Sequence, residues 1–294
     1  MAPSNILPHW RRAGGAALGL CGVLMVLHVM GALPSLPRSA GGALAGGGVA
    51  ALATAAGTLP VLLAQRYSQR MYDAFLGLGA GIMLAATAFS LVLPGIAASK
   101  AAGYGAVPAS LQVAGAIVLG AALVMLLDFV ARPAHVLEAG VSRASADGLR
   151  RAWMFVAAIT LHNLPEGLAI GVAYAGVDAA KAASLAAGIA IQDIPEGLVV
   201  ALALRAAGYG RVYSAGLGAA SGVVEPIAAV AGAVLIDIAA GLLPWGLGLA
   251  AGAMLFVICH DVIPEGHRNA NASSTSCAVV AGFIVMMVLD TALA

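Results

Sequence analysis

Long apolar stretches separated by short polar segments run through the whole chain. They lie approximately at residues 13–33, 42–64, 74–97, 109–131, 152–175, 182–204, 212–239, 244–263 and 277–293. Most reach the roughly 20 residues that a helix needs to cross the ~30 Å hydrocarbon core of a bilayer. The pattern therefore predicts an all-α polytopic membrane protein with nine spans.

The composition supports a membrane protein. Residues of the set AVILMFWYC make up 62% of the 294 residues and DEKR only 9%, whereas a soluble globule carries about 25% charged residues. The net charge of +1 and the lack of a dense basic run argue against a nucleic-acid partner. The first stretch resembles a signal peptide, but it is long for one and residues 33–37 make a poor cleavage site, so we expect it to be a span.

The distribution of basic residues predicts the orientation. With a cytoplasmic N-terminus, the loops inside the cell would hold eleven of the 14 basic residues: Arg11, Arg12, Arg66, Arg70, Arg132, Arg143, Arg150, Arg151, Arg205, Arg211 and Arg268. The outside loops would hold the other three, Arg38, Lys100 and Lys181. This bias follows the positive-inside rule. We therefore expect the N-terminus inside and the C-terminus outside.

The spans and loops divide the chain into four parts. Residues 1–41 hold the first span and its loop, and residues 42–131 hold spans two to four. Residues 132–151 form the longest polar stretch, which we expect to be a cytoplasmic loop. Residues 152–294 hold spans five to nine.

Two related polar motifs interrupt spans five and six near their middles. Residues 162–167 read HNLPEG and residues 192–197 read QDIPEG. An ionisable group at this depth costs ~2.5–3.5 kcal/mol and is a functional candidate by default. The first and fifth positions of each motif share one helix face, and the second lies beside it. Because a short loop joins the two spans, we expect the motifs to meet as antiparallel neighbours.

The residue types in these motifs suit a divalent metal. Imidazole, carboxylate and amide groups together favour zinc, iron, manganese or cobalt, and the absence of nearby thiolates argues against a tight structural zinc site. Pro165 and Pro195 are expected to open their helices, as in the discontinuous helices of transporter binding sites.

A third motif adds a carboxylate, because Glu225 in span seven is followed by a helix-breaking Pro226. With Glu166, Asp193 and Glu196 it would bring four negative charges together, which would not all stay ionised in a dry site. Two divalent cations would neutralise them. One site would use His162, Glu166, Gln192 and Glu196; the other would use Asn163, Glu166, Asp193, Glu196 and Glu225.

Several further residues are candidates along a path for the ion. Met83 in span three is a further candidate metal ligand through its soft thioether, although most methionines in spans are core residues. Ser90, further along the same span, is a candidate pathway residue. Four residues cluster at the cytoplasmic mouth of span eight: His260, Asp261, Glu265 and His267. We interpret them as an exit relay for the ion; the alternative is a solvated helix end. No prosthetic group is expected.

Taken together, residues 162–167, residues 193–197 and the pair Glu225–Pro226 resemble the signature of the ZIP (Zrt/Irt-like) metal transporters, with the bacterial GufA-type branch as the nearest match. The resemblance implies an eight-helix body beginning at residue 42, with the first span as an additional helix. Residues 260–265 also resemble an acidic segment that members carry late in the chain. The 132–151 loop departs from the family, because it lacks the histidine repeats of many eukaryotic members.

The resemblance implies uptake of Zn²⁺, or of Cd²⁺, Fe²⁺, Mn²⁺ or Co²⁺, across the inner membrane into the cytoplasm by an elevator-like secondary transporter. Spans two, five, six and seven would form the moving, metal-carrying bundle. Spans three, four, eight and nine would form a scaffold at a homodimer contact. The alternative is an intramembrane metal-dependent hydrolase, but the sequence has no HExxH motif and no evident nucleophile.

Overall fold

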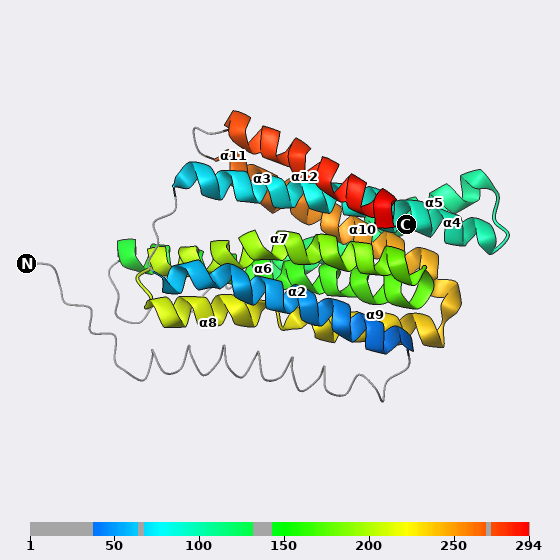
Figure 1. Cartoon of the computed structure of the whole chain (residues 1–294), viewed down its shortest axis with the longest axis horizontal. Helices are drawn as coiled ribbons and strands as arrows, with labels where there is room; N and C mark the ends of the chain where they lie inside the picture. The colour runs from blue at the N-terminus through cyan, green and yellow to red at the C-terminus, as the bar shows by residue number, and fades with distance from the viewer. Residues whose placement is uncertain (1–37, 64–67, 132–142, 269–271, 294) are drawn as a thin grey trace, which may run out of the picture.

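The structure is a computed structural model that describes residues 38–63, 68–131, 143–268 and 272–293, and every regular element in these ranges is helical. The longer helices lie roughly side by side along the molecule (Figure 1). In chain order the elements are α2 (Arg38–Leu62), α3 (Gln69–Ala85), η2 (Ala86–Val92), α4 (Leu93–Ala101), α5 (Ala106–Ala131), α6 (Arg143–Gly176), α7 (Ala179–Ala206), α8 (Arg211–Ser221), α9 (Val224–Ile238), η3 (Ala240–Leu242), α10 (Leu243–Val257), η4 (Ile258–Val262), α11 (Ile263–His267) and α12 (Ala272–Leu293).

The helical fold class is confirmed for the described residues. Seven stretches are long and apolar enough to cross a membrane: Ser39–Leu62, Arg70–Ala101, Ala106–Leu127, Ala179–Ala206, Arg211–Ile238, Ala240–His267 and Ala272–Ala292. The expected span 152–175 corresponds to the 34-residue helix α6. The expected span 13–33 lies outside the described residues. The count of nine and the orientation of the termini stay predictions.

Two helices continue further into polar sequence than the apolar pattern predicts. Helix α6 begins at Arg143, inside the stretch expected to be a loop, and the helix of the eighth span continues to His267. Hydropathy marks where a chain can contact lipid, whereas a helix ends where its backbone hydrogen bonds end. The two boundaries therefore need not coincide.

Prolines affect the helices differently from expectation. Pro165 and Pro195 do not break α6 and α7, which run unbroken through both residues. Each proline deletes one backbone hydrogen-bond donor. Packing against neighbouring helices keeps the remaining backbone hydrogen bonds of the helix in place. Pro226 does follow a break, because α8 ends at Ser221 and α9 begins at Val224. The two π-helical segments, η2 and η4, each end two residues before a proline, Pro94 and Pro264 respectively.

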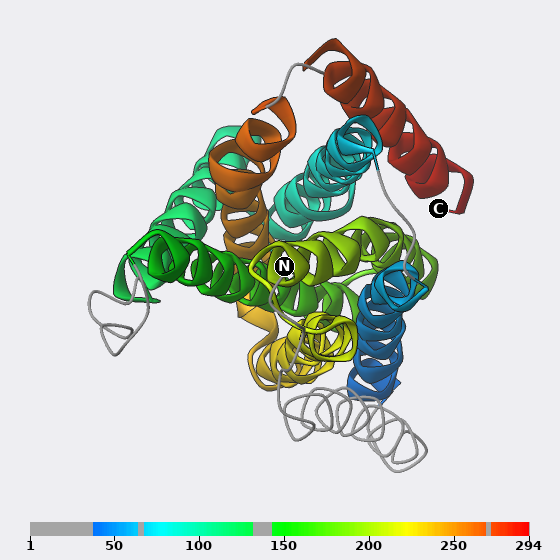
Figure 2. The same ribbon diagram turned by 90° about the vertical axis from the view of Figure 1, so that its left-hand side faces the viewer.

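The helices pack as two groups (Figure 2). The motif group consists of α2, α6, α7, α8 and α9, in which α2 packs on α7 and α9, and α6 packs on α9. The flanking group consists of α3, η2, α4, α5, α10, η4, α11 and α12, in which α3 packs on α12 and α5 on α10. The motif group therefore contains all three sequence motifs.

Glycines bring helix backbones into close contact inside each group. A β carbon added at each of seven glycines would lie 1.9–2.1 Å from a backbone carbonyl oxygen of a neighbouring helix in the same group. In the motif group these are Gly57 on Ile194, Gly171 on Ala229 and Gly197 on Thr54; in the flanking group they are Gly81 on Val279, Gly120 on Leu249, Gly252 on Ile117 and Gly282 on Leu78. Small residues allow membrane helices this close an approach.

The boundary between the groups is formed differently. A β carbon at Gly188 of α7 would meet the sulfur of Met286 of α12 at 2.3 Å, and one at Gly246 of α10 would meet the Val172 side chain at 3.2 Å. Where a described glycine faces the other group, the atoms that it meets belong to side chains. Backbones interlock within the groups, and side chains fill the space between them.

Candidate metal centre

The motifs meet because α6 and α7 form a tight hairpin. Only Val177 and Asp178 separate the two helices, and the Asp178 carboxylate caps α7 by accepting a hydrogen bond from the Ala180 backbone at 2.8 Å. The turn places residues 162–167 and residues 192–197 beside each other in the motif group. This juxtaposition is the one that the sequence spacing predicts.

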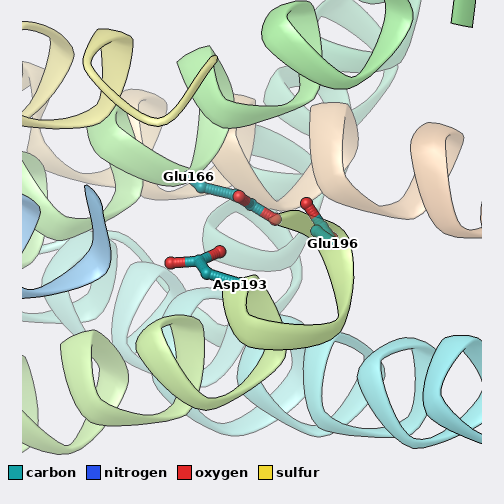
Figure 3. Close-up of side chains that lie close together, drawn as sticks. All are labelled: Glu166, Asp193 and Glu196. Atoms are coloured by element: carbon teal, nitrogen blue, oxygen red, sulfur yellow. The ribbon is translucent and has the colours of Figure 1, made fainter. Parts of the chain in front are cut away.

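Three carboxylates lie together between these helices. Glu166, Asp193 and Glu196 each offer an oxygen atom, and these atoms all lie within 4.8 Å of one another (Figure 3). The three side chains are at most 5% exposed. Acidic groups this close and this buried repel one another unless a cation or protons neutralise them.

Gln192 links two of the carboxylates. Its Nε2 donates to Oε1 of Glu166 at 2.5 Å and to Oδ1 of Asp193 at 3.1 Å. The amide therefore turns its nitrogen to the carboxylates and leaves its Oε1 as an acceptor.

A fourth carboxylate joins from α9. Glu225 is fully buried in the first turn of that helix, where the helix dipole favours negative charge. Its Oε1 accepts from Asn163 Nδ2 at 3.0 Å and from the Thr54 hydroxyl at 3.2 Å. Asn163 Nδ2 also donates to the Ser221 carbonyl at 3.1 Å, which ties α6 to the end of α8.

The site contains an unusual set of unpaired acceptors. Among the described residues, seven buried side-chain atoms here have no hydrogen-bond partner: His162 Nδ1, Asn163 Oδ1, Glu166 Oε2, Gln192 Oε1, Asp193 Oδ2, Glu196 Oε2 and Glu225 Oε2. Seven of the eight predicted ligand side chains, all except Met83, contribute one each. An unpaired buried polar atom costs roughly 1–3 kcal/mol, and more when it is charged. Divalent cations would satisfy several of these atoms at once, so this donor set fits metal.

His162 also contacts the flanking group. Its Nε2 lies 3.2 Å from Oδ2 of Asp261 in η4. One ring nitrogen therefore reaches across the boundary between the groups, while Nδ1 has no partner among the described residues.

The structure brings only Asp261 of the predicted exit relay to the motif residues. His260 is exposed and stacks on Phe256 with a ring separation of 5.0 Å. Glu265 pairs with Arg268 at 3.0 Å. His267 engages the Ile263 carbonyl at 2.9 Å through Nδ1 and the Ser276 hydroxyl at 3.0 Å through Nε2.

The two candidates on the third span have different surroundings. Met83 is 1% exposed and belongs to the main apolar core cluster. Ser90 lies in the π-helical segment η2, and its hydroxyl donates to Asp290 of α12 at 2.6 Å. Both residues belong to the flanking group.

The sequence reasoning missed Thr54, whose hydroxyl reaches Glu225 from α2. Thr54 and Thr58 are the only hydroxyl residues in the middle of a helix otherwise rich in alanine and glycine. That signal is weak, because threonine hydroxyls in helices usually bond to a carbonyl of their own helix.

Comparisons with known proteins agree with the motifs. The family model described as "ZIP Zinc transporter" matches residues 138–290. The chain is 44% identical to "Zinc transporter ZIPB" of Bordetella bronchiseptica, over 95% of this chain and 91% of that protein. It is 38% identical to "Zinc transporter GufA" of Myxococcus xanthus over 83% and 96%. It is 33% identical to "Zinc transporter ZIP11" of Homo sapiens over 82% and 94%.

Proposed function

This chain belongs to the ZIP family of zinc transporters, and from that membership we propose that it carries Zn²⁺ across a membrane through the buried carboxylate cluster. It is a transporter of this family rather than an enzyme, so the hydrolase alternative is set aside. The observation that carries the proposal is the set of seven unpaired buried polar atoms, one from each predicted ligand of the two sites.

The proposal is tested by flux. Proteoliposomes that contain the purified protein are expected to take up Zn²⁺ at a rate that saturates with zinc concentration. Protein-free vesicles are expected to take up far less. Competition by Cd²⁺, Fe²⁺, Mn²⁺ and Co²⁺ in the same assay would rank the other ions that this ligand set suits. Uptake no faster than in protein-free vesicles would contradict the proposed function.

We propose two metal positions in the cluster. His162, Glu166, Gln192 and Glu196 form a mixed nitrogen and oxygen site, and Asn163, Glu166, Asp193, Glu196 and Glu225 form an all-oxygen site. Glu166 and Glu196 bridge the two. Support comes from charge, since two divalent cations balance the four buried carboxylates.

Glu225 distinguishes the two positions, because it serves the all-oxygen site alone. Glu225→Gln removes one charge there, so elemental analysis of the purified variant is expected to find one zinc per chain where the unchanged protein holds two. Asp237→Asn is the matched control, since Asp237 lies on the same helix and accepts a hydrogen bond from Ser39 instead. Loss of both metals from Glu225→Gln would contradict the division.

We propose that transport proceeds by alternating access, with the motif group moving as a body against the flanking group. The packing supports this, because backbone contacts at glycines interlock helices inside each group, whereas side chains fill the boundary. A homodimer would use the flanking group, where α5 and α12 leave apolar side chains such as Leu119 and Ile284 exposed.

We propose that the ion is taken up through the inner membrane into the cytoplasm. Asp261 is the first acceptor on this route, because it already contacts His162. His260 precedes it in η4, and Glu265 and His267 follow it in α11. On the third span, Met83 is proposed as a further metal ligand and Ser90 as a pathway residue.

The direction of release depends on the side of the membrane that the relay faces. In a background with Cys21, Cys259 and Cys277 replaced by serine, His267→Cys is expected to resist a membrane-impermeant thiol reagent in intact cells and to react after permeabilisation. Lys181→Cys, at the exposed start of α7, is the matched control and is expected to react in intact cells. Labelling of position 267 from outside would overturn both the orientation and the relay.

A further inference from the structure

Thr54 lies where α2 contacts both the α7 motif and the break between α8 and α9. Its side chain is 1% exposed. Its backbone carbonyl lies 2.0 Å from the position of a β carbon on Gly197, and its Oγ1 lies 2.9 Å from that of a β carbon on Gly222. The residue is thus held between the α7 motif and the break that precedes Glu225.

The Thr54 hydroxyl has two acceptors within reach. It lies 3.2 Å from the Ala50 carbonyl of its own helix and 3.2 Å from Oε1 of Glu225. A hydroxyl has one proton to donate, so the two acceptors share it. The helix carbonyl fixes the orientation of the hydroxyl, and the carboxylate receives a donor whose position the backbone sets.

Asn163 supplies the second fixed donor to the same oxygen. Its Nδ2 donates to Glu225 Oε1 and to the Ser221 carbonyl. Because a carbonyl can only accept, the amide nitrogen must face these partners, and Asn163 Oδ1 is directed elsewhere. Glu225 therefore has one oxygen held by two donors, while Oε2 has no partner among the described residues.

We propose that Thr54 is a positioning residue for metal binding. By holding Oε1 of Glu225 together with Asn163, its hydroxyl fixes the carboxylate so that Oε2 is presented to the ion in the all-oxygen site. Thr54 does not bind the metal in this arrangement. The inference rests on the proposed metal cluster. It gives α2, which carries none of the three motifs, a direct part in setting the affinity of the all-oxygen site for metal. Partners of this kind orient metal ligands, and their loss typically weakens binding.

Two variants separate the hydroxyl from the shape of the side chain. Thr54→Val keeps the volume and removes the donor, so the zinc concentration for half-maximal uptake in proteoliposomes is expected to rise about tenfold, the effect of losing a hydrogen bond to a charged group. The maximal rate is expected to change far less. Thr54→Ser keeps the donor and is expected to restore half-saturation to within about twofold of the original value.

Thr58 provides the matched control one helical turn away. It is 3% exposed, and its hydroxyl donates to the Ala55 carbonyl at 2.7 Å. Thr58→Val removes the same atom from the same helix without touching Glu225, so half-saturation is expected to stay unchanged. Equal effects of Thr54→Val and Thr58→Val, or a Thr54→Ser variant as weak as Thr54→Val, would overturn the proposal.

A double-mutant cycle tests whether the effect passes through Glu225. In a Glu225→Ala background, Thr54→Val is expected to cause no further change in half-saturation or in bound zinc. A full additional loss there would overturn the proposal, as would a poorly folded Thr54→Val protein that Thr54→Ser does not rescue. Failure of the metal cluster itself would appear differently, as unchanged uptake when Glu196 is replaced.

Discussion

Replacing Glu196 with alanine is expected to reduce zinc uptake by more than about 100-fold, because it removes a ligand proposed to bridge both metal positions; loss of a residue that merely orients a ligand already costs about 10–100-fold. The purified variant is expected to bind neither zinc. Glu196 Oε2 is buried and has no hydrogen-bond partner among the described residues, so the truncation removes an acceptor for metal and breaks no hydrogen bond of that oxygen.

His162→Ala gives the informative comparison. It is also expected to cut uptake severely, but since His162 is proposed to serve the mixed site alone, one zinc is expected to remain in the all-oxygen site. Asp237→Ala is the control for loss of a carboxylate elsewhere in the motif group. Measurements are uptake in proteoliposomes and elemental analysis of the same preparations. Original rates in both His162→Ala and Glu196→Ala would refute the assignment of the site.

The sequence was sufficient to predict the cluster because helical spacing and a short hairpin determine it. His162 and Glu166 lie one turn apart, as do Gln192 and Glu196, and only two residues separate α6 from α7. With those constraints, the two motifs can meet only at similar depth. The six polar side chains named from spacing, and Glu225 from the third motif, each present an unpaired buried atom, whereas the predicted ligand Met83 does not.

Interactions between distant segments could not be predicted in this way. Thr54 reaches Glu225 across 171 residues, and His162 reaches Asp261 across 99; no local periodicity encodes such pairs. The prolines show a different limit. A local rule treats Pro165 and Pro195 alike as helix breakers, but tertiary packing decides whether a helix continues past the missing donor, and here both helices do.

The glycines suggest how the cluster could move without losing its geometry. Gly197 belongs to the α7 motif and contacts the Thr54 carbonyl, and Gly167 of the α6 motif would place a β carbon 2.4 Å from the Glu225 carbonyl. The motifs are therefore held to α2 and α9 through the residues next to their ligands. A displacement of the whole group would keep all four carboxylates in register.

A cross-link between the groups is expected to stop zinc uptake. In the serine-replaced background, Gly188→Cys with Met286→Cys joins α7 to α12, where a β carbon at position 188 would meet the Met286 sulfur at 2.3 Å. Replacing the methionine makes room for the new side chain. Once the pair is linked by oxidation, uptake is expected to fall to the level of the unlinked fraction, and reduction is expected to restore it. The reason is that the link would tie the group proposed to move to its neighbour.

A second pair tests whether the effect depends on the boundary rather than on cross-linking itself. Gly42→Cys with Tyr174→Cys joins α2 to α6 inside the motif group, at a contact of the same kind, with a β carbon at position 42 only 2.5 Å from the tyrosine ring. This link is expected to form and to leave uptake within about twofold of the reduced protein, since the proposed mechanism moves α2 and α6 together as one body. Full uptake by the linked 188–286 pair would mean that α7 and α12 stay in place during transport, and the two-group mechanism would then be wrong even if the metal cluster is right.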